Sequence, residues 1–126
     1  MGSLTNNLSR PEFACRCNCG FDTADFDLVN ILQDVVDHFG TCYILITGPN
    51  RCKEHNKAEG GAPDSQHIYG RAADFKIIDT ITRQPIKPIN VYRYLDDKYP
   101  GRYGLGLYSN RVHFDTRSGL FARWGA

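Results

Sequence analysis

Apolar residues recur at helical spacing over one long segment of the chain, residues 23–40. The apolar positions of that segment are Phe26, Leu28, Val29, Ile31, Leu32, Val35, Val36 and Phe39. This spacing places them on one face of a helix, with polar residues on the other. The pattern therefore predicts an amphipathic helix that begins at Thr23 or Asp25 and ends at Gly40. A shorter pattern over residues 90–99, followed by a Pro-Gly pair, predicts a second helix.

Other segments have the composition of β-strands. Residues 42–47 form a nearly continuous apolar run, which predicts a central strand buried on both faces. Residues 75–78 predict another strand. Residues 104–108 and 111–115, which a Ser-Asn pair separates, predict a hairpin. The polar stretches between these segments are expected to be loops, including all of residues 51–65.

The order of these segments predicts the fold class. Residues 1–22 have no sustained periodicity and are expected to form an irregular arm that Phe13 and Phe21 anchor. The whole pattern predicts one α+β domain over residues 1–126, with a small, mainly antiparallel sheet and helices packed on one side. A chain of 126 residues with 41% hydrophobic content can bury a core without the help of disulfides or metals.

The charge of the chain is nearly balanced, at fifteen basic against fourteen acidic residues and a net charge of +1. Such a chain has no global field that would attract nucleic acid, so we expect no nucleic-acid partner. No apolar run approaches the roughly 20 residues of a membrane span, and the polar N-terminus lacks the hydrophobic core of a signal peptide. We therefore expect no membrane insertion, and a monomer.

The five cysteines leave three alternatives open. Cys15, Cys17 and Cys19 are each two residues apart, and Cys42 and Cys52 flank the apolar strand. This spacing does not match the paired thiolates of a zinc knuckle, so reduced thiols are the default interpretation. A disulfide from the N-terminal cluster to Cys42 or Cys52, or a structural metal, are the alternatives.

Candidate chemistry is concentrated in His67 and Asp74, in a loop that feeds the strand at residues 75–78. A carboxylate buried there needs a positive partner, and a metal ion is one. The alternating segment around His113 is the best source of a third ligand. Two histidines and one aspartate leave an open position on zinc, which is typical of catalytic sites. The alternative is an ordinary hydrogen-bonded histidine and a capping aspartate, since short motifs often match by chance.

Several motifs together resemble a known family. They are the SxHxxGxAxD pattern at residues 65–74, TGPNRC at 47–52, GGA at 60–62, GLGLY at 104–108, VHFD at 112–115 and RW at 123–124. In this order and spacing they are similar to the zinc D-Ala-D-Ala carboxypeptidases and L-Ala-D-Glu endopeptidases of bacteria and phages, in the small single-domain branch. The resemblance implies that His67, Asp74 and His113 bind Zn²⁺.

The resemblance also implies roles for other residues. Arg51 would hold the substrate carbonyl or carboxylate, as a planar guanidinium can; the alternative is a surface arginine paired with Asp64 or Glu54. Several relatives have an acidic residue three positions before the last histidine, where this chain has Asn110. Asp115 is then the predicted catalytic base, with the alternative that it only orients a ligand histidine.

Two rim residues complete the predicted site. Tyr108 and Ser65 are predicted to bind substrate, although Tyr108 could instead serve packing. The implied reaction is hydrolysis of an amide bond in a peptidoglycan stem peptide by zinc-activated water. We expect action on the cell wall, in the periplasm or outside the cell, reached by holin release, a phage particle or an associated secretion route. A catalytically silent zinc-binding recognition module is the alternative function.

Overall fold

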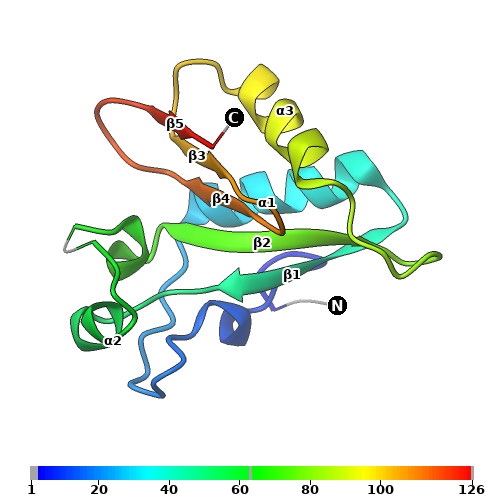
Figure 1. Cartoon of the computed structure of the whole chain (residues 1–126). Helices are drawn as coiled ribbons and strands as arrows, with labels where there is room; N and C mark the ends of the chain where they lie inside the picture. Colours follow the sequence, from blue (N-terminus) through cyan, green and yellow to red (C-terminus); the bar gives the residue numbers. More distant parts are fainter. Residues whose placement is uncertain (1–2, 63, 126) are drawn as a thin grey trace.

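A five-stranded sheet organises the chain in the computed structural model, which describes residues 3–62 and 64–125 (Figure 1). The strands are β1 (Cys42–Gly48), β2 (Ala72–Asp79), β3 (Gly104–Leu107), β4 (Val112–Asp115) and β5 (Ala122–Trp124). Their order across the sheet is β1-β2-β4-β3-β5, and only β3 and β5 pair in parallel. The prediction of an α+β fold with a small, mainly antiparallel sheet is confirmed.

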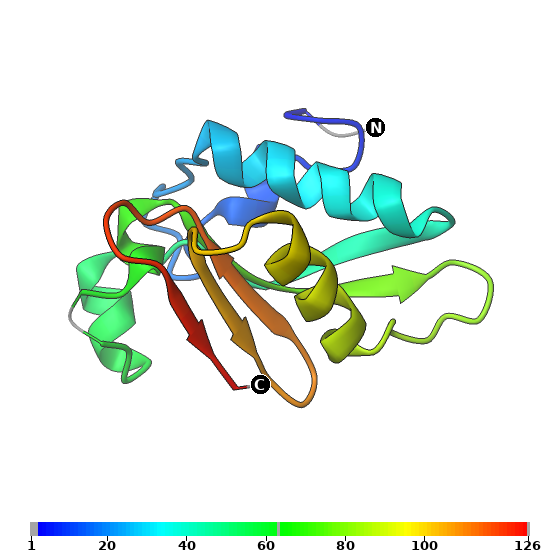
Figure 2. The same cartoon turned by 90° about the horizontal axis from the view of Figure 1, so that it is seen from above.

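Two helices cover the core face of this sheet. They are α1 (Phe26–Phe39) and α3 (Pro88–Lys98), which lie on the same side of the strands (Figure 2). Asp25 caps α1 by accepting a hydrogen bond from the Leu28 amide, and Gly40 ends it with a positive φ of 79°, which glycine adopts without strain. Both helices lie close to the predicted bounds, because the apolar residues that predicted them are the ones that pack in the core.

A third helix, α2 (Lys53–Ala58), lies in the stretch predicted to be a loop. Only one of its side chains, that of Asn56, is buried, so the segment has no apolar periodicity to reveal a helix. Two short 3₁₀ helices complete the secondary structure, η1 (Arg10–Phe13) and η2 (Gln66–Tyr69). In Figure 2, α2 lies at one end of the sheet, away from α1 and α3.

The prediction of a central position for the first strand is wrong. β1 is an edge strand that pairs only with β2. Its residues alternate, with Cys42, Ile44 and Ile46 in the core and Tyr43 and Leu45 on the open face, 43% and 47% exposed. A continuous apolar run does not distinguish a strand buried on two faces from one buried on a single face whose outer residues are also apolar.

The N-terminal arm packs against the core by Leu8 and Phe13, both fully buried, whereas Phe21 is only partly buried. The predicted anchor Phe13 is thus confirmed, and Leu8 is a second anchor. No helix in residues 3–62 and 64–125 is long and apolar enough to cross a bilayer.

One row of residues crosses all five strands on the face opposite α1 and α3. In order of the strands it is Gly48, Asp74, His113, Gly106 and Trp124, each the direct partner of the next. A Cβ on Gly48 would lie 2.5 Å from Asp74 Oδ2, and one on Gly106 would lie 2.2 Å from the Trp124 ring. The two glycines therefore leave the space that the larger side chains of the row occupy.

Candidate metal centre

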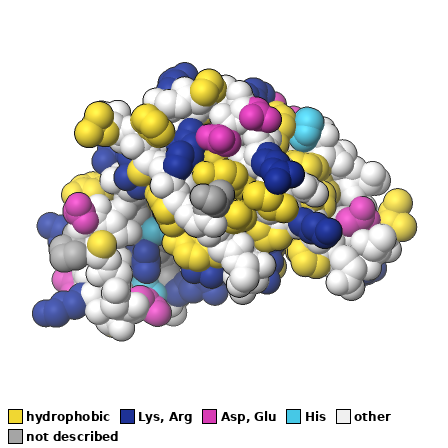
Figure 3. All heavy atoms as spheres, turned by 45° about the horizontal axis from the view of Figure 1, so that its top comes forward, with side chains coloured by type: hydrophobic (Ala, Val, Ile, Leu, Met, Phe, Trp, Pro, Cys, Tyr) yellow, Lys and Arg dark blue, Asp and Glu magenta, His cyan; other side chains and the backbone are white. Residues whose placement is uncertain are grey.

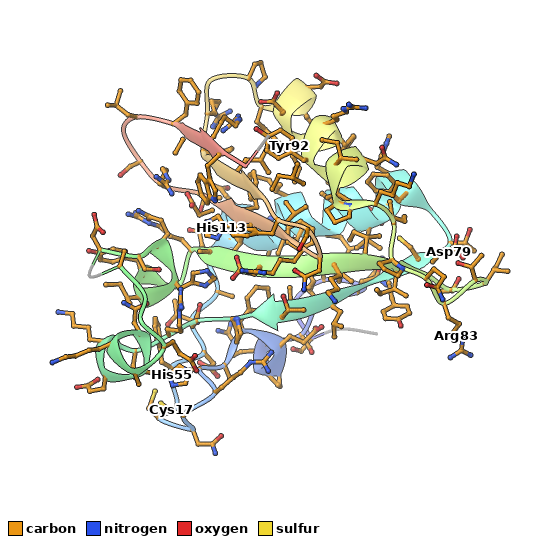
Figure 4. The ribbon with its side chains drawn as sticks, in the orientation of Figure 1. Cys17, His55, Asp79, Arg83, Tyr92 and His113 are labelled. Carbon is orange, nitrogen blue, oxygen red and sulfur yellow. The ribbon has the colours of Figure 1, made fainter. Side chains whose placement is uncertain are left out.

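Three predicted ligands converge on the open face of the sheet. His67 is presented by η2, Asp74 by β2 and His113 by β4, where it is the cross-strand partner of Asp74. His113 Nδ1 is 2.9 Å from Asp74 Oδ1, and His67 Nε2 is 3.5 Å from Asp74 Oδ2. One ligand atom from each residue lies within 4.8 Å of the others. Figure 4 shows His113 on β4 beside the start of β2.

The remaining nitrogen of each imidazole is held by an acceptor on the protein side. His67 Nδ1 lies 2.9 Å from the Pro49 carbonyl oxygen, and His113 Nε2 lies 2.7 Å from Asp115 Oδ2. A histidine that donates one N–H to a carbonyl or carboxylate is fixed in orientation and keeps its other nitrogen free for a metal. The two free nitrogens, His67 Nε2 and His113 Nδ1, are those that face Asp74.

Asp115 lies behind His113, away from the open side of the site. Its side chain is fully buried, and its oxygens accept hydrogen bonds from Arg117 Nε and Nη2, both at 2.8 Å, and from the Arg117 amide. Gly104 makes room for this pair, because a Cβ there would come within 2.6 Å of both Asp115 and Arg117 atoms. The surroundings of Asp115 are those of an acceptor that orients His113.

The charges of the site favour a bound cation. Burial raises the pKa of Asp74, but hydrogen bonds to His113 and His67 outweigh it, so the net pKa is lowered. Burial also lowers the pKa of His113, but its hydrogen bonds to Asp115 and Asp74 outweigh burial and raise it. The carboxylates of Asp74 and Asp115 thus stabilise a positive charge on His113. A bound divalent ion would supply positive charge at the same place.

A cleft of about 450 Å³ opens onto the three ligands and is also lined by Arg51, Ser65, Tyr108 and Trp124. A second hollow of about 420 Å³ adjoins it and shares four lining residues: Arg51, Glu59, Asp74 and Arg111. In Figure 3, histidine side chains lie at the bottom of the hollow between the α2 end of the molecule and the strands, with basic side chains around it. The ligand set is therefore open on one side.

The structure places Arg51 and Ser65 together in the wall of the cleft. Arg51 Nη2 donates to Ser65 Oγ at 3.3 Å, and Ser65 Oγ also accepts from the His67 amide. The buried Nε of Arg51 has no hydrogen-bond partner in residues 3–62 and 64–125, and none of the salt bridges in that part involves this arginine. The described residues thus give no support to the alternative pairing with Asp64 or Glu54.

Tyr108 also lines the cleft, where it accepts a hydrogen bond from Trp124 Nε1 at 3.1 Å and stacks under the Arg111 guanidinium. The sequence motifs gave Trp124 no role in the site, but its ring lies 5.0 Å from the His113 ring. The two alternating glycines of GLGLY were the available signal, because glycines on one face of a strand mark a close approach of another group.

Two carboxylates without a predicted catalytic role also line the cleft. Besides Asp74, the described carboxylates that line it are Glu59, which borders both hollows, and Asp64. Glu59 follows α2 and lies 3.4 Å from His55 Nε2. Asn110, at the position where several relatives have an acid, lines the second hollow and accepts a hydrogen bond from Arg111.

Comparison with known families agrees with this geometry. A family model described as Peptidase M15 matches residues 6–115. The chain belongs to the Peptidase M15 family. This family contains zinc peptidases of the D-Ala-D-Ala carboxypeptidase and endopeptidase type, so the sequence resemblance is confirmed. Neither the curated proteins nor the solved structures gave a match.

The donor set fits the zinc on which M15 peptidases depend. Two imidazole nitrogens and a carboxylate oxygen are ligands that zinc prefers, and each imidazole already has the outer hydrogen bond that catalytic zinc sites use. His67, Asp74 and His113 are therefore the residues of this chain that could hold the ion. The open cleft leaves access for water and a substrate.

Proposed function

We propose that this M15 family member is a zinc peptidase that hydrolyses an amide bond in a peptidoglycan stem peptide, either L-Ala-D-Glu or D-Ala-D-Ala. The observation that carries the proposal is the ligand triad, with both outer ring nitrogens fixed and its free side facing a cleft. The protein would act on the cell wall.

Different residues of the cleft would have different roles in hydrolysis. His67, Asp74 and His113 would hold a zinc ion, which would supply Lewis acidity toward a water molecule and the scissile carbonyl. Arg51 lines the cleft and forms none of the salt bridges among residues 3–62 and 64–125, so its charge is available to a carbonyl oxygen that gains negative charge or to a terminal carboxylate. Trp124 and Tyr108, which are joined by a hydrogen bond, also line the cleft and would orient the peptide.

Proton transfer needs a carboxylate that can reach the cleft. Asp115 was the predicted base, but it is fully buried and its oxygens are bonded to Arg117 and His113. We therefore assign Asp115 the positioning role and propose Glu59 as the proton acceptor, because its partly exposed carboxylate borders both hollows.

The test is digestion of purified sacculi, followed by mass spectrometry of the released muropeptides, which reports activity and the bond that is cut together. We expect new termini from the native protein and none from His67→Ala. Binding to sacculi without any product from the zinc-loaded protein would instead identify a silent recognition module, an outcome that the asparagine at position 110 makes worth testing.

The role of Glu59 is tested in the same assay with Glu59→Gln. We expect kcat to fall by about 10²- to 10⁴-fold, with zinc content unchanged. Glu54→Gln is the matched control, because Glu54 is an exposed acid on α2, the helix that Glu59 follows, and it does not line the cleft. Full activity of Glu59→Gln together with loss in Asp64→Asn would transfer the role to Asp64.

A further inference from the structure

Four of the five cysteines form a cluster outside the site described above. Cys15, Cys17 and Cys19 from the N-terminal arm meet Cys52, which precedes α2, and all four sulfur atoms lie within 4.8 Å of one another. Figure 4 shows Cys17 on the arm below α2, near His55. The fold thus brings together thiols that lie far apart in the chain.

The spacing of the sulfur atoms matches one tetrahedral ion. Cys15 Sγ is 3.3 Å from Cys17 Sγ, which is 3.6 Å from Cys52 Sγ. Four thiolates at the zinc–sulfur distance of about 2.3 Å form a tetrahedron with edges of about 3.8 Å. Cys17 approaches two different cysteines, whereas disulfides would join the four sulfurs strictly in pairs, each at about 2 Å.

The backbone around the cluster supplies the donors that thiolates need. The Cys52 amide donates to Cys15 Sγ, and the His55 amide donates to Cys52 Sγ, both at 3.4 Å. The arm is folded back on itself by a hydrogen bond from the Cys15 amide to the Phe21 carbonyl. N–H groups aimed at sulfur stabilise the anionic form that binds metals, as outer hydrogen bonds do at other metal centres.

We propose that Cys15, Cys17, Cys19 and Cys52 bind a second zinc ion, which is structural and independent of the ion at His67. A closed set of four thiolates leaves no position for water, which is the arrangement of structural zinc. Each thiol that coordinates releases its proton to the solvent, so binding of Zn²⁺ by four thiols releases up to four protons.

The ion would tie the arm to the wall of the cleft. Cys52 directly follows Arg51 and begins the segment that carries Glu59. On the arm, the Arg16 guanidinium donates to the carbonyl oxygens of Ile46 and Thr47, at the end of β1. α2 buries little of its own surface, so a metal cross-link explains how this polar helix is held in place.

The experiment counts zinc per chain in protein purified under reducing conditions with zinc and without chelator. We expect two equivalents in the native protein, one in Cys17→Ser and in Cys19→Ser, and one in His67→Ala. Cys42→Ser is the matched control and should retain two, because Cys42 is a buried thiol outside the cluster that contacts the Val36 carbonyl. Because His67→Ala isolates the cysteine site, its result does not depend on the proposed peptidase activity.

A second measurement does not require a variant to fold. In the native protein with zinc, iodoacetamide should modify the four cluster thiols much more slowly than after addition of a strong chelator, as read by mass spectrometry of peptides.

Cobalt substitution of His67→Ala should give the charge-transfer absorption of cobalt–thiolate bonds. Loss of all zinc in His67→Ala, free alkylation of the four thiols with zinc present, bound iron in place of zinc, or disulfides among them would each overturn the proposal.

Discussion

Replacing Asp115 with asparagine tests how the outer hydrogen bond of His113 controls the metal centre. The carboxylate accepts one hydrogen bond from His113 Nε2 and three from Arg117, in a position without solvent exposure. The amide in Asp115→Asn would keep the shape of the side chain but remove its charge, and its NH₂ group would face a donor. Both the hydrogen bond that orients the His113 ring and the Arg117 ion pair would be weakened.

The size of the effect follows from this geometry. Breaking one side of a buried ion pair costs about 3–5 kcal/mol. The Arg117 side chain is 23% exposed, so its guanidinium can turn toward water, and we expect the lower end of this range. Loss of an outer partner also weakens metal affinity by about 10- to 100-fold, or about 1.4–2.8 kcal/mol. A domain of this size has only about 5–15 kcal/mol of stability, so the change is easily measured.

The assay combines denaturant unfolding of the metal-free protein with zinc titration against a competing chelator. Asp96→Asn is the matched control, because it removes an aspartate whose side chain is 47% exposed from its ion pair with Arg123, and we expect a smaller loss there than at the fully buried Asp115. With enough zinc to saturate the variant, Asp115→Asn should recover most of its activity. Unchanged zinc affinity together with lost hydrolysis at saturating zinc would refute the positioning role and restore Asp115 as the base.

Two further substitutions probe the wall of the cleft and the helix layer. Gly106→Ala would place a Cβ 2.2 Å from the Trp124 ring, so we expect the indole to be displaced and activity to fall. The displacement should shift the fluorescence of this tryptophan, which is the only one in the chain. An unchanged fluorescence spectrum would contradict the packing of Trp124 against Gly106. Burial raises the pKa of Asp34, but hydrogen bonds from Lys98 and Tyr94 outweigh it and lower the net pKa. The stability that ionised Asp34 adds to the folded protein is fully present above the ordinary aspartate pKa near 4 and is lost as pH falls through the lower pKa of the folded state. In urea unfolding, Asp34→Asn should therefore be less stable than the native protein by up to about 1 kcal/mol at pH 6 and equally stable at strongly acidic pH. A stability difference that persists unchanged into acid would argue against this ion pair.

The elements that could be predicted are those whose side chains pack on one face. The helix at residues 26–39 was predicted because its apolar residues repeat at the spacing of its buried face. α2 was missed because nearly all of its residues face solvent or the cleft, and β1 was misplaced because two apolar residues lie on its open face. The periodicity of apolar residues in a sequence reflects which side chains are buried, so an element that is not held by burial of an apolar face, such as α2, has little sequence pattern that predicts it.

The residues of the site likewise fall into those that the sequence predicted and those that only the structure revealed. His67 and Asp74 were identified from a motif with fixed spacing and His113 from a separate alternating segment, and the fold brings the three together. The roles proposed for Trp124 and Glu59 depend on pairings between β3 and β5 and on the path of the α2 segment. Such contacts between residues far apart in the chain carry no local pattern, and the same holds for the meeting of Cys52 with the arm.

The row that crosses the five strands links metal binding to correct strand pairing. A shift of β4 by one residue would turn His113 toward the helices and bring Phe114 to the open face, because neighbouring residues of a strand point to opposite sides. Only the native alignment would then add the His113 imidazole to Asp74 and His67 and so complete the three-ligand set. Zinc would therefore select that alignment from misaligned chains during folding and stabilise it in proportion to the logarithm of its free concentration.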